Sequence, residues 1–220
     1  FTAFFSTAMQ SLLIALLTAL LTVFFAVLVL YFPKWNSIKF LRKSSRIAVL
    51  GYAIPGAVIA IGVMIPTLQL DKWLVRFSKD LFDVKIGLII NGTIIALLYA
   101  YVIRFLAVAF NPLEASHLKI EKSLSESSRL LGMGFVKTFF KIDLPLLKSG
   151  LLSAFILVFV DTMKELPLTL ILKPYNINTL AVKAYEYASD ELIMEAALPS
   201  LCIIATGVLP IIVLNRLVLK

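Results

Sequence analysis

The sequence predicts an all-α membrane protein. Of its 220 residues, 60 % are apolar, and the mean hydropathy is +0.97. Only 15 % are charged, against about 25 % in an ordinary soluble domain, and a soluble core of this size cannot cover so much apolar surface. The apolar residues gather in five runs close to the length of a membrane-spanning helix, about 20 residues. The same composition excludes a disordered chain, and a single cysteine, Cys202, excludes a disulfide scaffold.

The five runs are expected to be helical because backbone polar groups in lipid must be hydrogen-bonded within their own segment. Pro55 and Pro66, with Gly51, Gly56 and Gly62, interrupt the second run. These residues permit close helix packing or, alternatively, a hinge. The expected spans are residues 4–32, 47–70, 86–110, 150–172 and 196–214.

The basic residues predict the orientation of the spans. The first loop, the third loop and the C-terminal tail contain five, six and two Lys or Arg residues, whereas the second and fourth loops contain four and two. Cytoplasmic loops carry an excess of Lys and Arg, so the C-terminus is expected in the cytoplasm and the N-terminus outside. The net charge of +8 is therefore explained by basic residues in the loops that are expected in the cytoplasm. For this reason nucleic acid is not an expected partner. Because the chain begins at Phe1 and residues 1–32 carry no charge, we interpret it as a fragment of a longer protein.

The third loop, residues 111–149, is longer than a connector requires and shows helical signals. Asn111-Pro112 is typical of an N-cap followed by the first residue of a helix. Ser123 and Glu126 have the spacing of a capping box, which predicts a second short helix.

Gly132 is expected to end that second helix, because glycine adopts positive φ without strain. Phe135, Phe139 and Phe140 follow on a further short helical segment, and Leu144-Pro145 begins the fourth span. Exposed Leu and Phe side chains here would lie on the lipid surface, pack under the bundle or bind a partner.

This loop resembles the EAA loop of bacterial ABC importer permeases. The family pattern is E-A-A-x3-G-x9-I-x-L-P. In this sequence the pattern begins at Glu126-Ser127-Ser128, its glycine is Gly132, and it ends at Ile142 and Leu144-Pro145, with the same spacing throughout. Two serines replace two alanines, a small-for-small exchange that keeps close packing possible. The resemblance implies that residues 1–220 are a single type I ABC importer transmembrane domain whose loop forms coupling helices against an ATPase subunit. The implied ATPase-coupling residues are Glu126, Ser127, Ser128, Arg129, Leu131, Gly132, Ile142, Leu144 and Pro145.

Further motifs are similar to the iron(III)-type permeases of that superfamily. They are Tyr52-Ala53-Ile54-Pro55-Gly56, Arg104-Phe105-Leu106-Ala107 and Lys164-Glu165-Leu166-Pro167-Leu168-Thr169. The resemblance covers residues 46–210. Permeases of that group often contain two such halves in one chain, and the present chain would correspond to the C-terminal half.

Charged residues also fall inside the expected spans, where each costs about 2.5–3.5 kcal/mol on insertion scales. These charges could compensate one another within the membrane: Asp161 would pair with Lys164, three residues later, and the Arg104 side chain would extend toward the cytoplasm. Arg104 with Asp161 is a further candidate pair. Alternatively the charges line a translocation path or gate, at which Pro167 frees a backbone carbonyl. The path or gate residues would be Arg104, Asp161, Lys164, Glu165 and Pro167.

The fourth loop, residues 173–195, carries four acidic residues close to two tyrosines. These features are typical of an interfacial helix with aromatic anchors. The resemblance implies instead a surface that receives an extracytoplasmic substrate-binding protein. Its residues would be Tyr185, Glu186, Tyr187 and Asp190.

The sequence lacks a phosphate-binding loop, metal-ligand spacing and a hydrolase elbow. We therefore expect no catalytic residue, no metal site and no cofactor on this chain, and ATP and magnesium would bind a separate ATPase. The single histidine, His117, is expected to be a surface residue.

The resemblances imply a permease subunit of an ATP-driven, binding-protein-dependent importer in the bacterial inner membrane, with ferric iron as the expected cargo. Its partners would be two ATPase subunits, a second permease half, a substrate-binding protein and the lipid bilayer. Spermidine, thiamine, sulfate and phosphonate importers share the EAA loop, so another cargo stays open. A non-transporting membrane scaffold is the alternative function, and a membrane enzyme would need clustered reactive groups that the sequence does not show.

Overall fold

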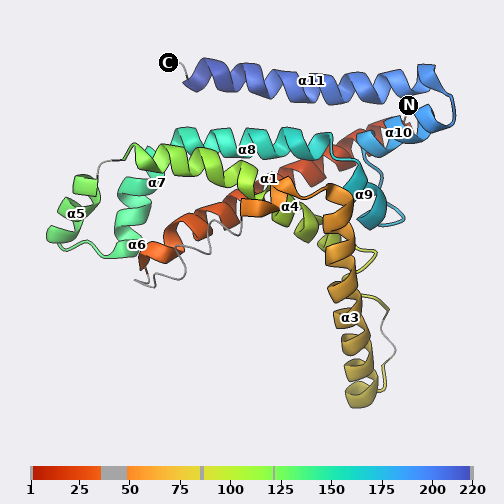
Figure 1. Cartoon of the computed structure of the whole chain (residues 1–220), viewed down its shortest axis with the longest axis horizontal. Helices are drawn as coiled ribbons and strands as arrows, with labels where there is room; N and C mark the ends of the chain where they lie inside the picture. Colours follow the sequence, from red (N-terminus) through yellow and green to blue (C-terminus); the bar gives the residue numbers. More distant parts are fainter. Residues whose placement is uncertain (1, 36–48, 85–86, 121, 219–220) are drawn as a thin grey trace.

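The computed structural model describes residues 2–35, 49–84, 87–120 and 122–218 (Figure 1). All regular structure in these ranges is helical, which confirms the predicted all-α class. Four helices are long and apolar enough to cross a membrane, and a bent pair supplies a fifth span if it is counted as one. The four are α1 (Thr2–Trp35), α3 (Gly56–Phe82), α4 (Ile94–Leu118) and α11 (Ile193–Val218).

The first and last predicted spans coincide with helices, since α1 and α11 contain them entirely. Pro199 and Pro210 lie inside α11 without ending it. The predicted starts of the second and third spans, at residues 47 and 86, lie outside the described ranges. So do four of the five basic residues of the first loop, Lys39, Arg42, Lys43 and Arg46.

The second span differs from the prediction at both ends. A 3-10 helix, η1 (Val49–Ala53), leads to Pro55, and α3 begins only at Gly56. Proline disfavours helical backbone in the residue before it, which separates the two helices. The helix then continues beyond residue 70, because the polar residues there include no helix breaker, and ends where Asp83 adopts a left-handed φ of 50°.

The third span is also displaced. α4 begins after Thr93, whose hydroxyl caps the helix, and it continues through Asn111 and Pro112. The prediction that this pair opens a new helix is therefore wrong. The continued helix packs closely against the next span, because a Cβ on Gly150 would lie 3.0 Å from the Pro112 carbonyl oxygen.

The fourth span is broken. α8 (Lys148–Met163) ends inside the predicted span, and α9 (Pro167–Leu172) follows after a turn. On the other side, residues 135–146 meet α8 at an angle of 71°, so the predicted path from Leu144-Pro145 into the membrane bends sharply at Leu147. A further helix, α10 (Leu180–Ser189), connects α9 to α11.

The core of the bundle lies between α1, α4 and α8, and α11 lies beside α8 (Figure 1). Fully buried alanines permit these helices to approach closely, as small residues do in membrane bundles. α3 leaves the bundle and points away from it, and only its first turns meet α4 and α9. The buried alanines are Ala19, Ala26, Ala100, Ala109 and Ala154.

The glycines of the predicted second span have different surroundings. A Cβ on Gly51 would overlap the carbonyl oxygen of Ile103, so glycine lets η1 touch α4. Gly62 faces open space. The predicted close approach therefore holds for Gly51, and for Gly56 as described below, but not for Gly62.

Candidate functional site

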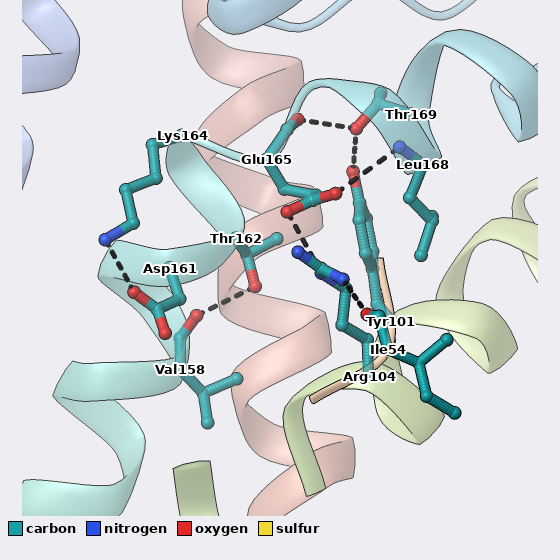
Figure 2. A network of polar contacts seen from close by, with 10 residues as sticks. All are labelled: Ile54, Tyr101, Arg104, Val158, Asp161, Thr162, Lys164, Glu165, Leu168 and Thr169. Atoms are coloured by element: carbon teal, nitrogen blue, oxygen red, sulfur yellow. Dashed lines mark hydrogen bonds and ion pairs between the residues drawn. The ribbon is translucent and has the colours of Figure 1, made fainter. Parts of the chain in front are cut away.

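The turn between α8 and α9 lies beside α4 and the start of α3, and an ion pair joins these elements (Figure 2). Arg104, in the middle of α4, donates from Nε to Oε2 of Glu165 at 3.1 Å. Its Nη1 donates to the carbonyl oxygen of Ile54 at 2.8 Å. The two charged side chains are only 17 % and 7 % exposed, so each depends on the other for compensation.

Glu165 also holds the start of α9. Its Oε1 accepts a hydrogen bond from the N–H of Leu168 at 3.3 Å, a group that has no helical carbonyl to bind. Gly56 packs directly against the pair, since a Cβ there would lie 2.5 Å from Oε1 of Glu165 and 3.2 Å from Cζ of Arg104. The ion pair can occupy this position only because residue 56 has no side chain.

A second polar contact links α4 to α9. The hydroxyl of Thr169 donates to the carbonyl oxygen of Glu165 at 2.7 Å and also hydrogen-bonds with the hydroxyl of Tyr101 (Figure 2). Because the single hydroxyl proton of Thr169 goes to that carbonyl, Tyr101 is the donor in the second bond. Both side chains are fully buried, so two separate contacts fix α9 against α4.

Asp161 and Lys164 form the predicted ion pair, with 2.8 Å between Oδ1 and Nζ (Figure 2). Lys164 is 61 % exposed. The other two expectations for Arg104 are wrong: it neither reaches alone toward the cytoplasm nor binds Asp161, because the turn after α8 directs Glu165 to it instead. Pro167 is the first residue of α9, where its missing N–H removes no hydrogen bond of that helix.

The predicted short helix of the third loop is α5 (Lys122–Leu130). It begins one residue before Ser123, so this serine lies inside the helix rather than capping it. Gly132 follows with a φ of +82°, and the N–H of Met133 donates to the carbonyl of Ser128 at 3.1 Å. This is the hydrogen bond of a Schellman C-cap, and it confirms Gly132 as the end of the helix.

The residues with the EAA-loop spacing differ in how far their side chains are exposed. Ser128 is buried, and its hydroxyl bonds with that of Thr138 at 2.9 Å, which ties α5 to α6 (Phe135–Thr138). The Arg129 side chain lies outside the described part of the structure. Exposed members are Glu126, Ser127, Leu131, Gly132 and Pro145, while Ile142 and Leu144 are partly buried.

The residues expected to bind a substrate-binding protein lie on or next to α10. Glu186 accepts a hydrogen bond from Lys183 at 2.6 Å, and this bond raises the pKa of Lys183. The same ammonium lies 5.8 Å from the ring centroid of Tyr187. Tyr185 and Asp190 are exposed, whereas Glu186 and Tyr187 already have a partner within the helix.

Asp71 is a buried carboxylate that sequence patterns alone do not single out. Its Oδ1 accepts from the backbone N–H groups of Ile89 and Ile90, both at 3.0 Å. Its Oδ2 accepts from the backbone N–H of Asn91 at 2.8 Å and from the Asn91 amide at 3.1 Å. These bonds fix the segment before α4 against α3. The turn signal Asn91-Gly92 marks that segment, but nothing in the sequence links it to Asp71.

His117 is partly exposed and also contacts another helix. Its Nδ1 lies 3.2 Å from the hydroxyl of Tyr31, and the two rings meet edge to face at 5.4 Å. This contact joins the end of α4 to the end of α1. Within the described ranges, no three His, Cys, Asp or Glu residues lie close enough to hold a metal ion.

Comparison with known proteins gives the family context. The family described as "Binding-protein-dependent transport system inner membrane component" matches residues 36–220. The chain is 28 % identical over 224 residues to the Fe(3+)-transport system permease protein FbpB 2 of Haemophilus influenzae. It is 32 % identical over 84 residues to the molybdate/tungstate transport system permease protein WtpB of Methanocaldococcus jannaschii.

These relatives are longer than the aligned regions. The match to FbpB 2 covers 100 % of this chain and 40 % of that protein. The match to WtpB covers 37 % of this chain and 33 % of that protein. The aligned region therefore covers less than half the length of either relative.

Proposed function

This chain belongs to the family of binding-protein-dependent transport system inner membrane components, and from that premise we propose that it forms half of the translocation path of an ATP-driven ferric iron importer. A second permease half would complete the path. Two ATPase subunits would bind ATP and magnesium on the cytoplasmic side, and a substrate-binding protein would deliver the cargo from outside. The chain itself would carry no catalytic residue.

The end of α5 carries this proposal. α5 projects from one end of the bundle (Figure 1), and Leu130 and Leu131 at its tip are 89 % and 82 % exposed. Adjacent aliphatic side chains this exposed are typical of a surface that binds a partner. The spacing from Glu126 to Pro145 supports an ATPase subunit as that partner.

The junction between α4, α9 and α3 supports a gate in the path. The broken fourth span provides a hinge, and the pair of Arg104 and Glu165 would act as a latch that opens when α9 moves. Because the pair also binds the carbonyl of Ile54 and packs on Gly56, release of α9 would be transmitted to α3.

Ferric iron is the favoured cargo because the ferric relative aligns with the whole chain, whereas the molybdate/tungstate relative aligns with 37 % of it. The test uses the assembled transporter in proteoliposomes, with its ATPase subunits and binding protein. We expect the iron-loaded binding protein to stimulate both ATP hydrolysis and iron uptake, and molybdate to stimulate neither.

If molybdate stimulates ATP hydrolysis and uptake and iron does not, the iron assignment is contradicted, but the permease function is not. If the chain assembles with the ATPase but no tested binding protein supports uptake of a solute, the scaffold alternative is favoured. The two outcomes are distinguishable because the first retains solute-stimulated ATP hydrolysis.

A further inference from the structure

An apolar pocket of about 370 Å³ opens between the second half of α1 and the corner at which α7 (Leu144–Leu146) leads into α8. In Figure 1 the end of α1 lies near α6, and α7 leads from there toward α8. The segment from Phe139 to Asp143 forms a π-helical turn here, η2, and such turns are frequent at functional sites. The pocket is lined by Val23, Phe24, Val27, Phe139, Phe140 and Leu144, among others.

The pocket opens to the surroundings of the bundle rather than into its core. Tyr31 and Phe139 form its buried side and are 3 % and 8 % exposed. Phe24 and Phe140 stand at its rim and are 57 % and 60 % exposed. In a membrane these rim residues would face lipid, so lipid tails have direct access.

Three lysines lie in the segments that form the corner. Lys137, Lys141 and Lys148 are all exposed, and none of the ion pairs in the described part of the chain includes them. Lys141 follows the rim residue Phe140, and Lys148 begins α8. The only acid between Lys137 and Lys148, Asp143, is buried. The corner therefore presents an apolar hollow beside unneutralised positive charge.

We propose that this pocket binds one acyl chain of an anionic phospholipid of the inner leaflet, with the headgroup at Lys141 and Lys148. The proposal rests on the cytoplasmic placement of the third loop, because the lysines must lie at headgroup depth. Basic sites between membrane helices on the cytoplasmic side are suited to anionic headgroups.

The size of the pocket suits a small ligand such as one acyl chain. A pocket of about 370 Å³ lies within the range of small-ligand sites, roughly 300–1,000 Å³. The bound acyl chain would stabilise η2 and α7, which lie between α5 and α8.

The test replaces Phe24 with the photoreactive residue p-benzoylphenylalanine in the assembled transporter. The transporter is reconstituted into vesicles of equimolar phosphatidylglycerol and phosphatidylcholine, and adducts are identified by mass spectrometry after irradiation. We expect phosphatidylglycerol adducts to exceed phosphatidylcholine adducts. The variants Lys141→Gln and Lys148→Gln should each lower that excess, by about fivefold per lysine.

A matched control places the same photoreactive residue at Ile204, which is 58 % exposed on α11. Its lipid adducts should follow the composition of the vesicle. Adducts at position 24 that also follow that composition would overturn the proposal, and so would an adduct to protein, which would identify a partner helix as the occupant. The assay requires neither cargo nor ATP hydrolysis, so its failure is separate from failure of the transport function.

Discussion

At the scale of single residues, the contact of Arg104 with Glu165 differs in kind from that of Asp161 with Lys164. The first pair is largely buried and bound to the backbone of Ile54, whereas the ammonium of the second is mostly exposed. Removing one partner of a buried pair leaves an uncompensated charge and costs about 3–5 kcal/mol. An exposed pair is worth about 0–1 kcal/mol. The buried pair is therefore the one that can control the position of α9.

We predict that Glu165→Gln strongly reduces cargo uptake, because the Arg104 charge loses its partner and α9 loses its latch. The assembled complex should still be recovered from the membrane. Uptake by proteoliposomes and the amount of purified complex are the two measurements.

Asp161→Asn is the matched control, and it should transport close to the wild-type rate. The double variant Arg104→Gln with Glu165→Gln removes both charges and should recover thermal stability. If that double variant also transports normally, the pair has only a structural role. Wild-type uptake by Glu165→Gln itself would refute the gate.

At the scale of elements, α5 is defined by its end. Gly132 has a φ of +82° and Gly134 a φ of −69°, and a Cβ at either position would have no neighbouring atom within 4 Å. A side chain would thus meet no steric obstacle at either glycine. Only the left-handed backbone of Gly132 disfavours other residues, by roughly 1–2 kcal/mol, and a β-branched residue is especially unfavourable there.

We predict that Gly132→Val abolishes stimulation of ATP hydrolysis by the loaded binding protein, because the end of α5 and its exposed leucines would be displaced. The protein should remain in the membrane. Gly134→Val should retain most of the stimulation, since its backbone is compatible with any residue. Full stimulation by Gly132→Val would show that α5 does not couple to the ATPase.

At the scale of the whole molecule, two highly exposed residues mark opposite ends. Leu131 lies beyond α5, and Tyr175, which is 101 % exposed, lies between α9 and α10. Figure 1 shows these elements at opposite ends of the bundle. The distribution of lysine and arginine predicts that the end with α5 faces the cytoplasm.

The chain offers a direct test of this orientation because Cys202 is its single cysteine. In a Cys202→Ala background, a membrane-impermeant maleimide applied to spheroplasts should label Tyr175→Cys. It should label Leu131→Cys only after lysis. The reverse pattern would invert the topology and would also remove the basis for an inner-leaflet lipid at Lys141 and Lys148.

Features encoded within a few residues could be predicted from the sequence. Long uncharged runs predicted α1 and α11, Gly132 predicted the end of α5, and a spacing of three residues predicted the pair of Asp161 and Lys164. In each of these cases the determining interaction is local to the backbone or to one helical turn.

Features that depend on distant contacts could not be predicted. The pair of Arg104 and Glu165 joins residues 61 positions apart, and Asp71 binds residues 18 to 20 positions away. The ends of α3 and α4 that hydropathy predicted were also wrong. A hydropathy profile shows where an apolar run ends, but a helix can continue through the polar residues that follow.

The sequence by itself determined that the chain is a helical membrane protein, which orientation is expected, and which loop has the spacing of a coupling segment. Apolar length, basic-residue distribution and motif spacing are one-dimensional properties, so a sequence can state them. Only the tertiary structure decided that the fourth span is broken and that Glu165, rather than Asp161, binds Arg104. That choice depends on the space left by Gly56, which exists only once α3, α4 and α9 are packed together.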